Sequence, residues 1–518
     1  MPTYLSPGVY VEEAPSGSRP IEGVGTAVTA FVGFAEKGPF HAPTLVTNWS
    51  QYVQLFGGMV EGTYLANAVY GYFSNGGGIA YVVRVGASGA DRASAGNAPK
   101  AIANGEAAQV GTFRAAALGS AGGGAITVEI ADSDAEGAGE DRFKVIVHQN
   151  GNAAETYEGS FRRRSDNNVA AQIRERSKLI TMEEAAPANA LTRPANQSVT
   201  LPAPAPAPAA DIVAAGLSVD EFAGDVDTRS GLGGLEAIDE ITVIAAPDLM
   251  GAYQQGALDL EEVKAAQLAL ISHCEQMGDR MAILDPPPDL TAQQVRVWRQ
   301  ETAGYDSKFA TLYYPWVKVF DPAGGRTILM PPSGHVAGLW SRTDTERGVH
   351  KAPANEVLRG VIDLQNNLTK GEQDLLNPIG VNCIRSFPGR GVRVWGARTL
   401  SSDPAWRYIN VRRLFNYIEE SILLGTQWIV FEPNDQRLWG TIRRNITAFL
   451  TEEWRGGALF GATAAESFYV KCDSETNPPE VIDRGQVVCE IGLCPVKPAE
   501  FVVFRLSQFS DSTSLVNE

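Results

Sequence analysis

The sequence predicts a mixed α/β (α+β) protein built from several domains. Strands and helices alternate from about residue 27 to residue 85, and the same alternation resumes near residue 240. A stretch of different composition separates the two parts, and two strongly amphipathic helices follow near the C-terminus. At 518 residues the chain is long enough to bury several cores. We therefore expect a discontinuous α/β domain, an insertion and a C-terminal α/β domain.

Five segments follow from this division. We expect an N-terminal arm at 1–20, a discontinuous domain at 21–85 plus 235–380 and a peripheral insertion domain at 86–234. A C-terminal domain at 381–500 and a C-terminal arm at 501–518 complete the chain.

The first arm contains one short segment with strand character. An apolar alternation lies between Pro7-Gly8 and Pro15, and its residues are Val9, Tyr10, Val11 and Glu12. A lone strand leaves its backbone groups unpaired, so it needs a sheet to join.

The first part of the discontinuous domain reads as strand, helix, helix, strand. A buried-type strand at 27–33 precedes a helix that Asn48 or Ser50 can cap. A second helix ends at Asn75-Gly-Gly-Gly78, before a strand at 79–85. In a phosphate loop the glycines follow a strand and precede a helix, which is the opposite order. These glycines therefore predict a tight turn.

The insertion is rich in alanine and glycine. It has strand-like pieces at 125–130 and 143–147, and a charged segment at 162–178 that is compatible with a helix. The Pro-Ala repeat at 202–208 predicts a stiff, extended spacer. We expect a β-rich domain here.

The α/β alternation resumes after the insertion. We expect strands at 240–246, 281–284 and 310–319, with helices at 260–277 and 291–301 between them. This order is typical of a mostly parallel sheet with helices packed on it.

The C-terminal domain is expected to contain two amphipathic helices. One carries Val411 to Ile422 on a single face, with Asn410 as its cap and Gly425 as its stop; the other has an apolar stripe from Leu438 to Trp454. Further strands are expected at 428–431, 468–472, 487–491 and 501–506.

Composition excludes several classes of function. The chain has 43 basic and 60 acidic residues, a formal charge of −17, which argues against nucleic acid as the main partner. It has no apolar run long enough to insert in a membrane and no secretory signal. Its five cysteines are typical of reduced thiols in a cytoplasmic product, which would leave the cell by lysis or another route.

No motif for catalysis, metal binding or a cofactor stands out. The five histidines form no zinc signature, and no nucleophile elbow occurs. Cys489 and Cys494 lack the two-residue spacing of a zinc knuckle, so small buried side chains are the favoured interpretation. We expect a protein that is not an enzyme and has no cofactor, with an enzyme whose site is unrecognised as an alternative.

Eight segments share a distinctive pattern and order, namely 4–13, 75–85, 331–338, 344–354, 386–413, 428–433, 468–473 and 495–501. In this order they resemble the contractile tail sheath proteins of phage tails and related injection particles. The resemblance covers roughly residues 1–85 and 235–510 and not the insertion.

The resemblance implies a homo-oligomer of stacked hexameric rings around an inner tube, with baseplate and terminal cap proteins as further partners. Contraction would drive the tube through a target envelope. Phage tail, bacteriocin and injection system share these motifs, with a slight preference for an injection system. A tube or baseplate component is the other structural alternative.

The resemblance also implies terminal strands that add to the sheets of adjacent subunits. The strands for exchange are Val9 to Glu12 and the C-terminal residues Phe501, Val502, Val503, Phe504 and Leu506. Pairing within the same chain is the alternative. Arg437, Arg443 and Arg444 lie off the apolar stripe of the last helix and are candidates for contact with an acidic tube, with a solvated face as the alternative.

Overall fold

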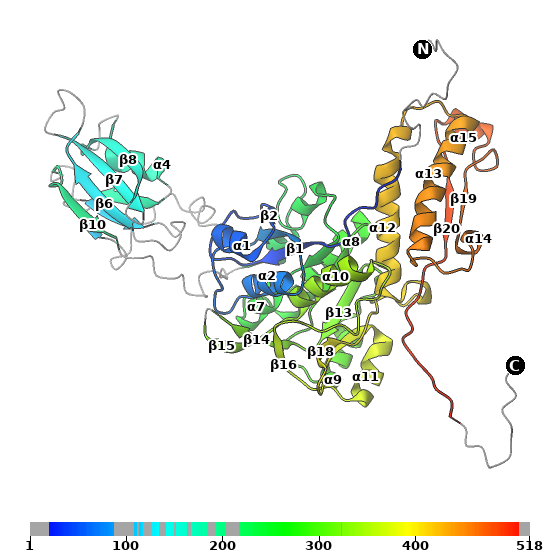
Figure 1. Cartoon of the computed structure of the whole chain (residues 1–518). Helices are drawn as coiled ribbons and strands as arrows, with labels where there is room; N and C mark the ends of the chain where they lie inside the picture. Colours follow the sequence, from blue (N-terminus) through cyan, green and yellow to red (C-terminus); the bar gives the residue numbers. More distant parts are fainter. Residues whose placement is uncertain are drawn as a thin grey trace, which may run out of the picture.

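The computed structural model describes most of the chain. The described residues are 20–86, 108–110, 113–117, 126–133, 141–149, 152–162, 167–177, 179–184, 192–201, 217–322 and 324–506. The expected strand at Val9–Glu12 and the Pro-Ala repeat at 202–208 lie outside them. The observed fold is mixed α/β, which confirms the expected class (Figure 1).

One eight-stranded sheet organises the larger part of the molecule. Its order is β18-β17-β13-β12-β11-β1-β3-β2, with parallel pairing from β17 to β3 and an antiparallel strand at each edge. β1 (Val28–Gly33) lies between β3 (Ile79–Arg84) and β11 (Val243–Ala245). The chain before and after the insertion therefore builds one sheet.

The remaining strands of this sheet come from both sides of the insertion. They are β2 (Thr44–Val46), β12 (Met281–Leu284), β13 (Ala310–Tyr314), β17 (Val381–Phe387) and β18 (Gly391–Val394). The boundary expected at residue 380 falls before β17 and β18, yet both strands belong to this sheet. Its core continues to Ile409.

Two helices pack closely near β1. α2 (Leu65–Ser74) lies against α10 (Ser333–Arg347), a helix that the sequence did not predict. A Cβ on Gly338 would lie 2.3 Å from the backbone oxygen of Tyr72, so only glycine permits this approach. α1 (Trp49–Phe56) begins as expected, because Asn48 accepts from the amide of Gln51 at 2.9 Å.

Other helices follow the expected alternation. α7 (Asp248–Gln254) and α8 (Leu260–Met277) precede β12. α9 (Ala292–Val297) continues as a π-helix over Trp298–Ala303, and α11 (Lys370–Leu376) precedes β17. α6 (Val219–Ala223) packs on the same core through Phe222, so this domain resumes before residue 235.

The strand expected at 310–319 was wrong in one respect, because it is two strands. Pro315, which has no amide hydrogen, separates β13 from β14 (Val317–Asp321). β14 leaves the main sheet and pairs with β15 (Arg326–Met330) and β16 (Val361–Leu364).

The insertion is β-rich and has a core of its own. β6 (Ile126–Ala131), β7 (Arg142–Gln149), β8 (Asn152–Ser160) and β10 (Gln197–Thr200) form one sheet. β4 (Ala108–Val110), β5 (Phe113–Ala117) and β9 (Ile180–Glu184) form another, and α4 is Val169–Arg176. Their buried side chains form a separate cluster.

The C-terminal unit has a third core. It contains α12 (Ile409–Thr426), α13 (Gln436–Arg455), α14 (Ala464–Ser467) and α15 (Pro479–Asp483). β19 (Phe468–Lys471) and β20 (Glu490–Leu493) pair antiparallel. The apolar stripes of α12 and α13 meet in this core, as their periodicity predicts.

Three details predicted for this unit were wrong, and one strand is shifted. Residues 427–429 form a 3-10 turn instead of a strand at 428–431, and the strand expected at 487–491 lies two to three residues later, as β20. Asn410 does not cap α12, because its side chain donates to the backbone oxygens of His350 and Val496. Gly425 lies inside α12 instead of ending it.

Candidate functional site

The C-terminal tail is the most exposed apolar segment of the described chain. Residues 501–506 form no strand with the other described residues, and in Figure 1 they run away from the domains as an extended line. The exposed fractions are 73% for Phe501, 69% for Val502, 77% for Val503, 83% for Phe504 and 97% for Leu506.

The tail leaves the body from one fixed point. The carboxylate of Glu500 accepts from Arg398 at 2.8 and 2.7 Å, from Asn377 at 2.6 Å and from Tyr408 at 3.0 Å. Burial opposes ionisation of Glu500, but these hydrogen bonds and the Arg398 charge bring its pKa below the usual value. The residue before the exposed segment is therefore held between the main sheet and the start of α12.

The small sheet of the C-terminal unit has open edges. β19 and β20 pair with each other from Phe468 opposite Leu493 to Lys471 opposite Glu490. Within the described ranges neither strand pairs with a third strand. A two-stranded sheet is marginal by itself, and both edges present free backbone donors and acceptors.

The three candidate arginines of α13 are all exposed, but they do not share one face. Arg437 and Arg444 are seven residues apart and lie on the same side of the helix. Arg443 points elsewhere, because its Nη1 donates to the backbone oxygen of Cys472 at 3.1 Å. None of the three forms an ion pair with another described residue.

A buried ion pair joins α12 to the main domain. Arg413 donates to both carboxylate oxygens of Asp344 on α10, at 2.9 and 2.5 Å, and to the backbone oxygen of Thr26 at 2.9 Å. The Thr26 hydroxyl donates to Asp344 at 2.7 Å, and both charged side chains are 4% exposed. We call Arg413, Asp344 and Thr26 the interdomain clasp.

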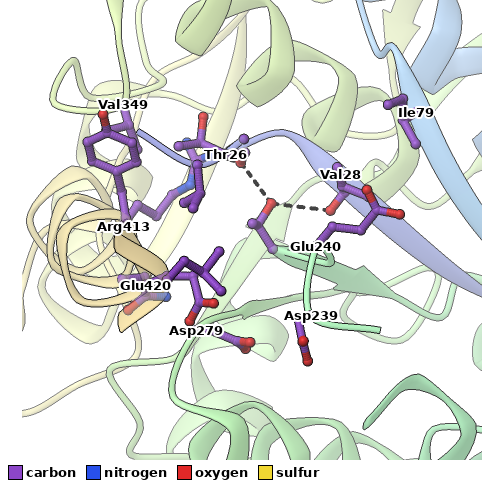
Figure 2. Close-up of a pocket in the computed structure, with 15 residues that line it drawn as sticks. Thr26, Val28, Ile79, Asp239, Glu240, Asp279, Val349, Arg413 and Glu420 are labelled. Atoms are coloured by element: carbon purple, nitrogen blue, oxygen red, sulfur yellow. Dashed lines mark hydrogen bonds between the residues drawn. The ribbon is translucent and has the colours of Figure 1, made fainter. Parts of the chain in front are cut away.

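An acidic pocket of about 440 Å³ adjoins the clasp. Figure 2 shows Glu420 of α12 on one side and Asp239, Glu240 and Asp279 of the main domain on the other. Burial raises the pKa of Glu420, and the charges of Asp279 and Asp239 raise it further. Like charges therefore face each other across the seam that the clasp closes.

Two buried titratable side chains, Asp248 and His335, belong to the packed core of the main domain. Asp248 accepts from the backbone amides of Phe34 at 2.6 Å, Leu65 at 3.2 Å and Tyr64, and burial raises its pKa to about 7. It joins β1, α2 and α7. Burial likewise lowers the pKa of His335 to about 4.

The described residues contain no cluster of side chains that could hold a metal ion. Cys274, Cys383 and Cys472 are buried thiols, whereas Cys489 and Cys494, expected to be buried, are only partly covered. Among the helices of these ranges, none combines the length and apolar composition needed to cross a bilayer.

Sequence reasoning missed Glu500 and the clasp as functional contacts. Arg398 and Glu500 are 102 positions apart, and Asp344 and Arg413 are 69 apart. Separations of this size leave no periodic signal. Both ion pairs lie in or beside segments that carried the resemblance, which was the only available indication.

Two family models match consecutive parts of the chain. The phage tail sheath protein central domain matches residues 232–400, and the phage tail sheath C-terminal domain matches residues 401–509. Together they cover more than half of the chain. Their junction follows β18 and precedes α12, where the main core gives way to the C-terminal core.

Curated relatives carry the same description. A tail sheath protein of Vibrio phage KVP40 is 32% identical over 190 residues, which are 36% of this chain and 27% of that protein. A putative prophage major tail sheath protein of Pseudomonas aeruginosa (strain UCBPP-PA14) is 27% identical over 47% of this chain and 62% of its own length. The matched segment thus spans less than two thirds of both relatives.

Solved structures match over nearly the whole chain. The helical sheath of the anti-feeding prophage in its contracted state has a TM-score of 0.58 and 25% identity, covering 98% of this chain and all of that one. The contracted sheath of an extracellular contractile injection system, PVC, has a TM-score of 0.57 and 23% identity, covering 98% and 99%. An anti-feeding prophage baseplate structure has a TM-score of 0.56 and 24% identity, covering 98% and 100%. The sheath proteins are structural, in agreement with a chain that is not an enzyme. The chain is therefore a member of the phage tail sheath protein family.

Proposed function

We propose that this protein is the repeating subunit of a contractile sheath in a phage tail or a related injection particle. It assembles with copies of itself as stacked hexameric rings around an inner tube, and baseplate and cap proteins bound the stack. Contraction drives the tube through a target envelope. The fold shared with two contracted sheaths supports this assignment.

The observation that carries the proposal is that the same chain has both an incomplete sheet and an exposed tail without a partner strand among the described residues. β19 and β20 offer free edges, and Phe501 to Leu506 is an apolar segment of strand length that its own chain leaves exposed. Addition of a strand from one chain to the sheet of another satisfies both. The arm at Val9, Tyr10, Val11 and Glu12 is proposed to do the same at the other edge.

Truncation after Glu500 tests the tail. We expect a folded, dispersed subunit that no longer polymerises, because the apolar side chains of residues 501–506 are at least 69% exposed and belong to no described core. Long ribbed tubes formed by the truncated protein, seen by negative-stain electron microscopy, would refute strand exchange by the tail.

Single substitutions distinguish backbone hydrogen bonding by the tail from non-specific association of its apolar side chains. Val503→Pro removes an amide hydrogen and is expected to weaken polymerisation, whereas Val503→Thr keeps the amide and strand propensity and should still polymerise. Equal loss in both variants would point to side-chain contact instead of strand addition.

The tube contact is proposed for α13. Arg437 and Arg444 share a face, so Glu at both positions should weaken assembly templated by an acidic tube more than Arg443→Glu does. The measurement is co-sedimentation of the subunit with purified tube. Arg443 is the matched control, since its side chain is engaged by Cys472.

The energy for contraction is proposed to come from contacts between subunits and not from nucleotide hydrolysis. A purified sheath that contracts only with ATP would overturn this. An injection particle is favoured over a phage tail because the match to the sheath of an extracellular contractile injection system covers 98% of this chain. Assembly in the cytoplasm and release by lysis complete the proposal.

A further inference from the structure

A second cavity, separate from the acidic pocket, is lined by arginines, one of which is the Arg398 that holds Glu500. It has a volume of about 680 Å³ and lies between the end of the π-helix, the start of β17 and the loop that follows β18. The charged residues that line it are Arg299, Arg398, Arg407 and Asp306. We propose that this cavity binds a carboxylate.

Arg299 is the first observation that points to an anion. It is only 8% exposed, and its Nη2 donates to the backbone oxygens of Tyr305 at 2.6 Å and Leu400 at 3.4 Å. Its Nε has no acceptor, and the side chain forms no ion pair with any residue that the structure describes. The charge of Asp306 acts on Arg299, but no described carboxylate lies within ion-pair distance of it. Burial of a guanidinium without a directly bonded counter-ion is costly, and an anion in the adjoining cavity would offset that cost.

Arg407 supplies a second free cation on the wall of the cavity. It is exposed, and in the described ranges its side chain has no ion pair. Arg398 does not add to this charge, because Glu500 neutralises it. Burial lowers the pKa of Arg299, which agrees with a cation placed where water alone does not solvate it.

Asp306 compensates the arginines of the cavity only in part. Its carboxylate accepts from the amide of Ser402 at 2.8 Å and from the Ser402 hydroxyl at 2.5 Å. Its charge acts on Arg299, but it lies outside ion-pair distance of Arg299 and Arg407. Arg299 and Arg407 thus outnumber the one carboxylate that lines the cavity.

A carboxylate fits this arrangement better than a spherical anion. Guanidinium groups bind planar carboxylates through paired hydrogen bonds, and the cavity has room for a whole side chain. The chain has 60 acidic residues and a formal charge of −17, so acidic side chains are plentiful on its copies. If the proposed function holds, an acidic side chain of a second copy is one source of the carboxylate; a free dicarboxylate is the other.

The site is tested first on the full-length subunit before polymerisation. Succinate is titrated at constant ionic strength, and the midpoint of thermal unfolding is followed, with sodium chloride and phosphate as comparisons. We expect succinate to raise Tm in a saturable way, Arg407→Ala to weaken its binding at least tenfold, and Arg296→Ala to behave as wild type. Arg296 lies two residues before the π-helix and is not among the residues that line the cavity.

Two results would overturn the site. One is a succinate effect no larger than that of chloride, and the other is an Arg407→Ala variant that binds as wild type does. Equal binding of phosphate would overturn the assignment to a carboxylate. Arg407 is chosen because it is exposed, so its replacement leaves the core intact.

The source of the carboxylate is tested by polymerisation of Arg407→Glu, with Arg296→Glu as the control. A tenfold or larger loss in the first variant alone assigns the ligand to a second copy. Unchanged polymerisation, with succinate binding still dependent on Arg407, assigns it to a free carboxylate. If the wild-type protein forms no tubes, the proposed function fails while the succinate result stands.

Discussion

The interdomain clasp gives the sharpest prediction about stability. Replacing Arg413 by Met removes two hydrogen bonds to Asp344 and one to Thr26. It leaves the Asp344 carboxylate 4% exposed, with only the Thr26 hydroxyl as a partner among the clasp residues. Loss of one partner from a buried pair costs about 3–5 kcal/mol, which is a large fraction of the ~5–15 kcal/mol that holds a domain folded.

The cost should appear at the seam between domains. α12 has a core of its own with α13, so we expect it to detach from α10 before that core melts. Hydrogen exchange followed by mass spectrometry should show faster exchange near Thr26 and in the first turns of α12, with β12 unchanged. Urea unfolding should show an earlier, separate phase for the C-terminal unit.

A mutant cycle checks the reasoning. Asp344→Asn alone should also be destabilising, and Arg413→Met with Asp344→Leu should cost less than the sum of the single variants, since no unpaired charge remains. Asp363→Asn is the control, because its pair with Lys318 is about half exposed and should contribute under about 1 kcal/mol. If Arg413→Met shifts stability by no more than this control, the clasp does not join the domains.

Three further outcomes are expected. Gly338→Ala should lower Tm by several degrees because its Cβ would meet the backbone of Tyr72, whereas Gly371→Ala, with open space around it, should be neutral; equal effects would contradict the close packing of α2 on α10. Burial and neighbouring carboxylates raise the pKa of Glu420, so its ionisation opposes folding increasingly as pH rises above the pKa of the unfolded chain. Glu420→Gln should therefore be more stable than wild type at pH 7 and equal to it near pH 4, and chemical denaturation at both values would show this. Burial raises the pKa of the Cys274 thiol, so a thiol reagent at pH 8 should modify it only after unfolding; rapid reaction in the native protein would contradict its burial.

Periodic elements could be predicted from the sequence, and non-periodic ones could not. α8 occupies the expected residues 260–277 because its apolar positions recur on one face and Asp259 caps it. α10 was missed because residues 333–343 are buried all round and include glycine and serine, so no polar face marks a helix. Helix prediction from apolar periodicity requires that one face of the helix meets water, and α10 has no such face over residues 333–343.

Apolar runs misled the prediction where their partner lies elsewhere. Residues 428–431 look like a buried strand, but they form the turn between α12 and α13, with Phe431 at φ 69° and fully exposed. Phe501 to Leu506 has strand composition but pairs with no strand among the described residues. Residue composition indicates that a segment prefers to be a β-strand. It does not indicate whether the partner strand belongs to the same chain or to another.

The anchor at Glu500 has a mechanical consequence. A force applied to the tail reaches the hydrogen bonds of Glu500 before it reaches the hydrogen bonds between β19 and β20. Arg398 and Tyr408 then pass the load to the main sheet and to the start of α12 together. A force on the tail therefore acts at the junction of the two domains. We expect it to move the subunit as one body instead of separating β19 from β20.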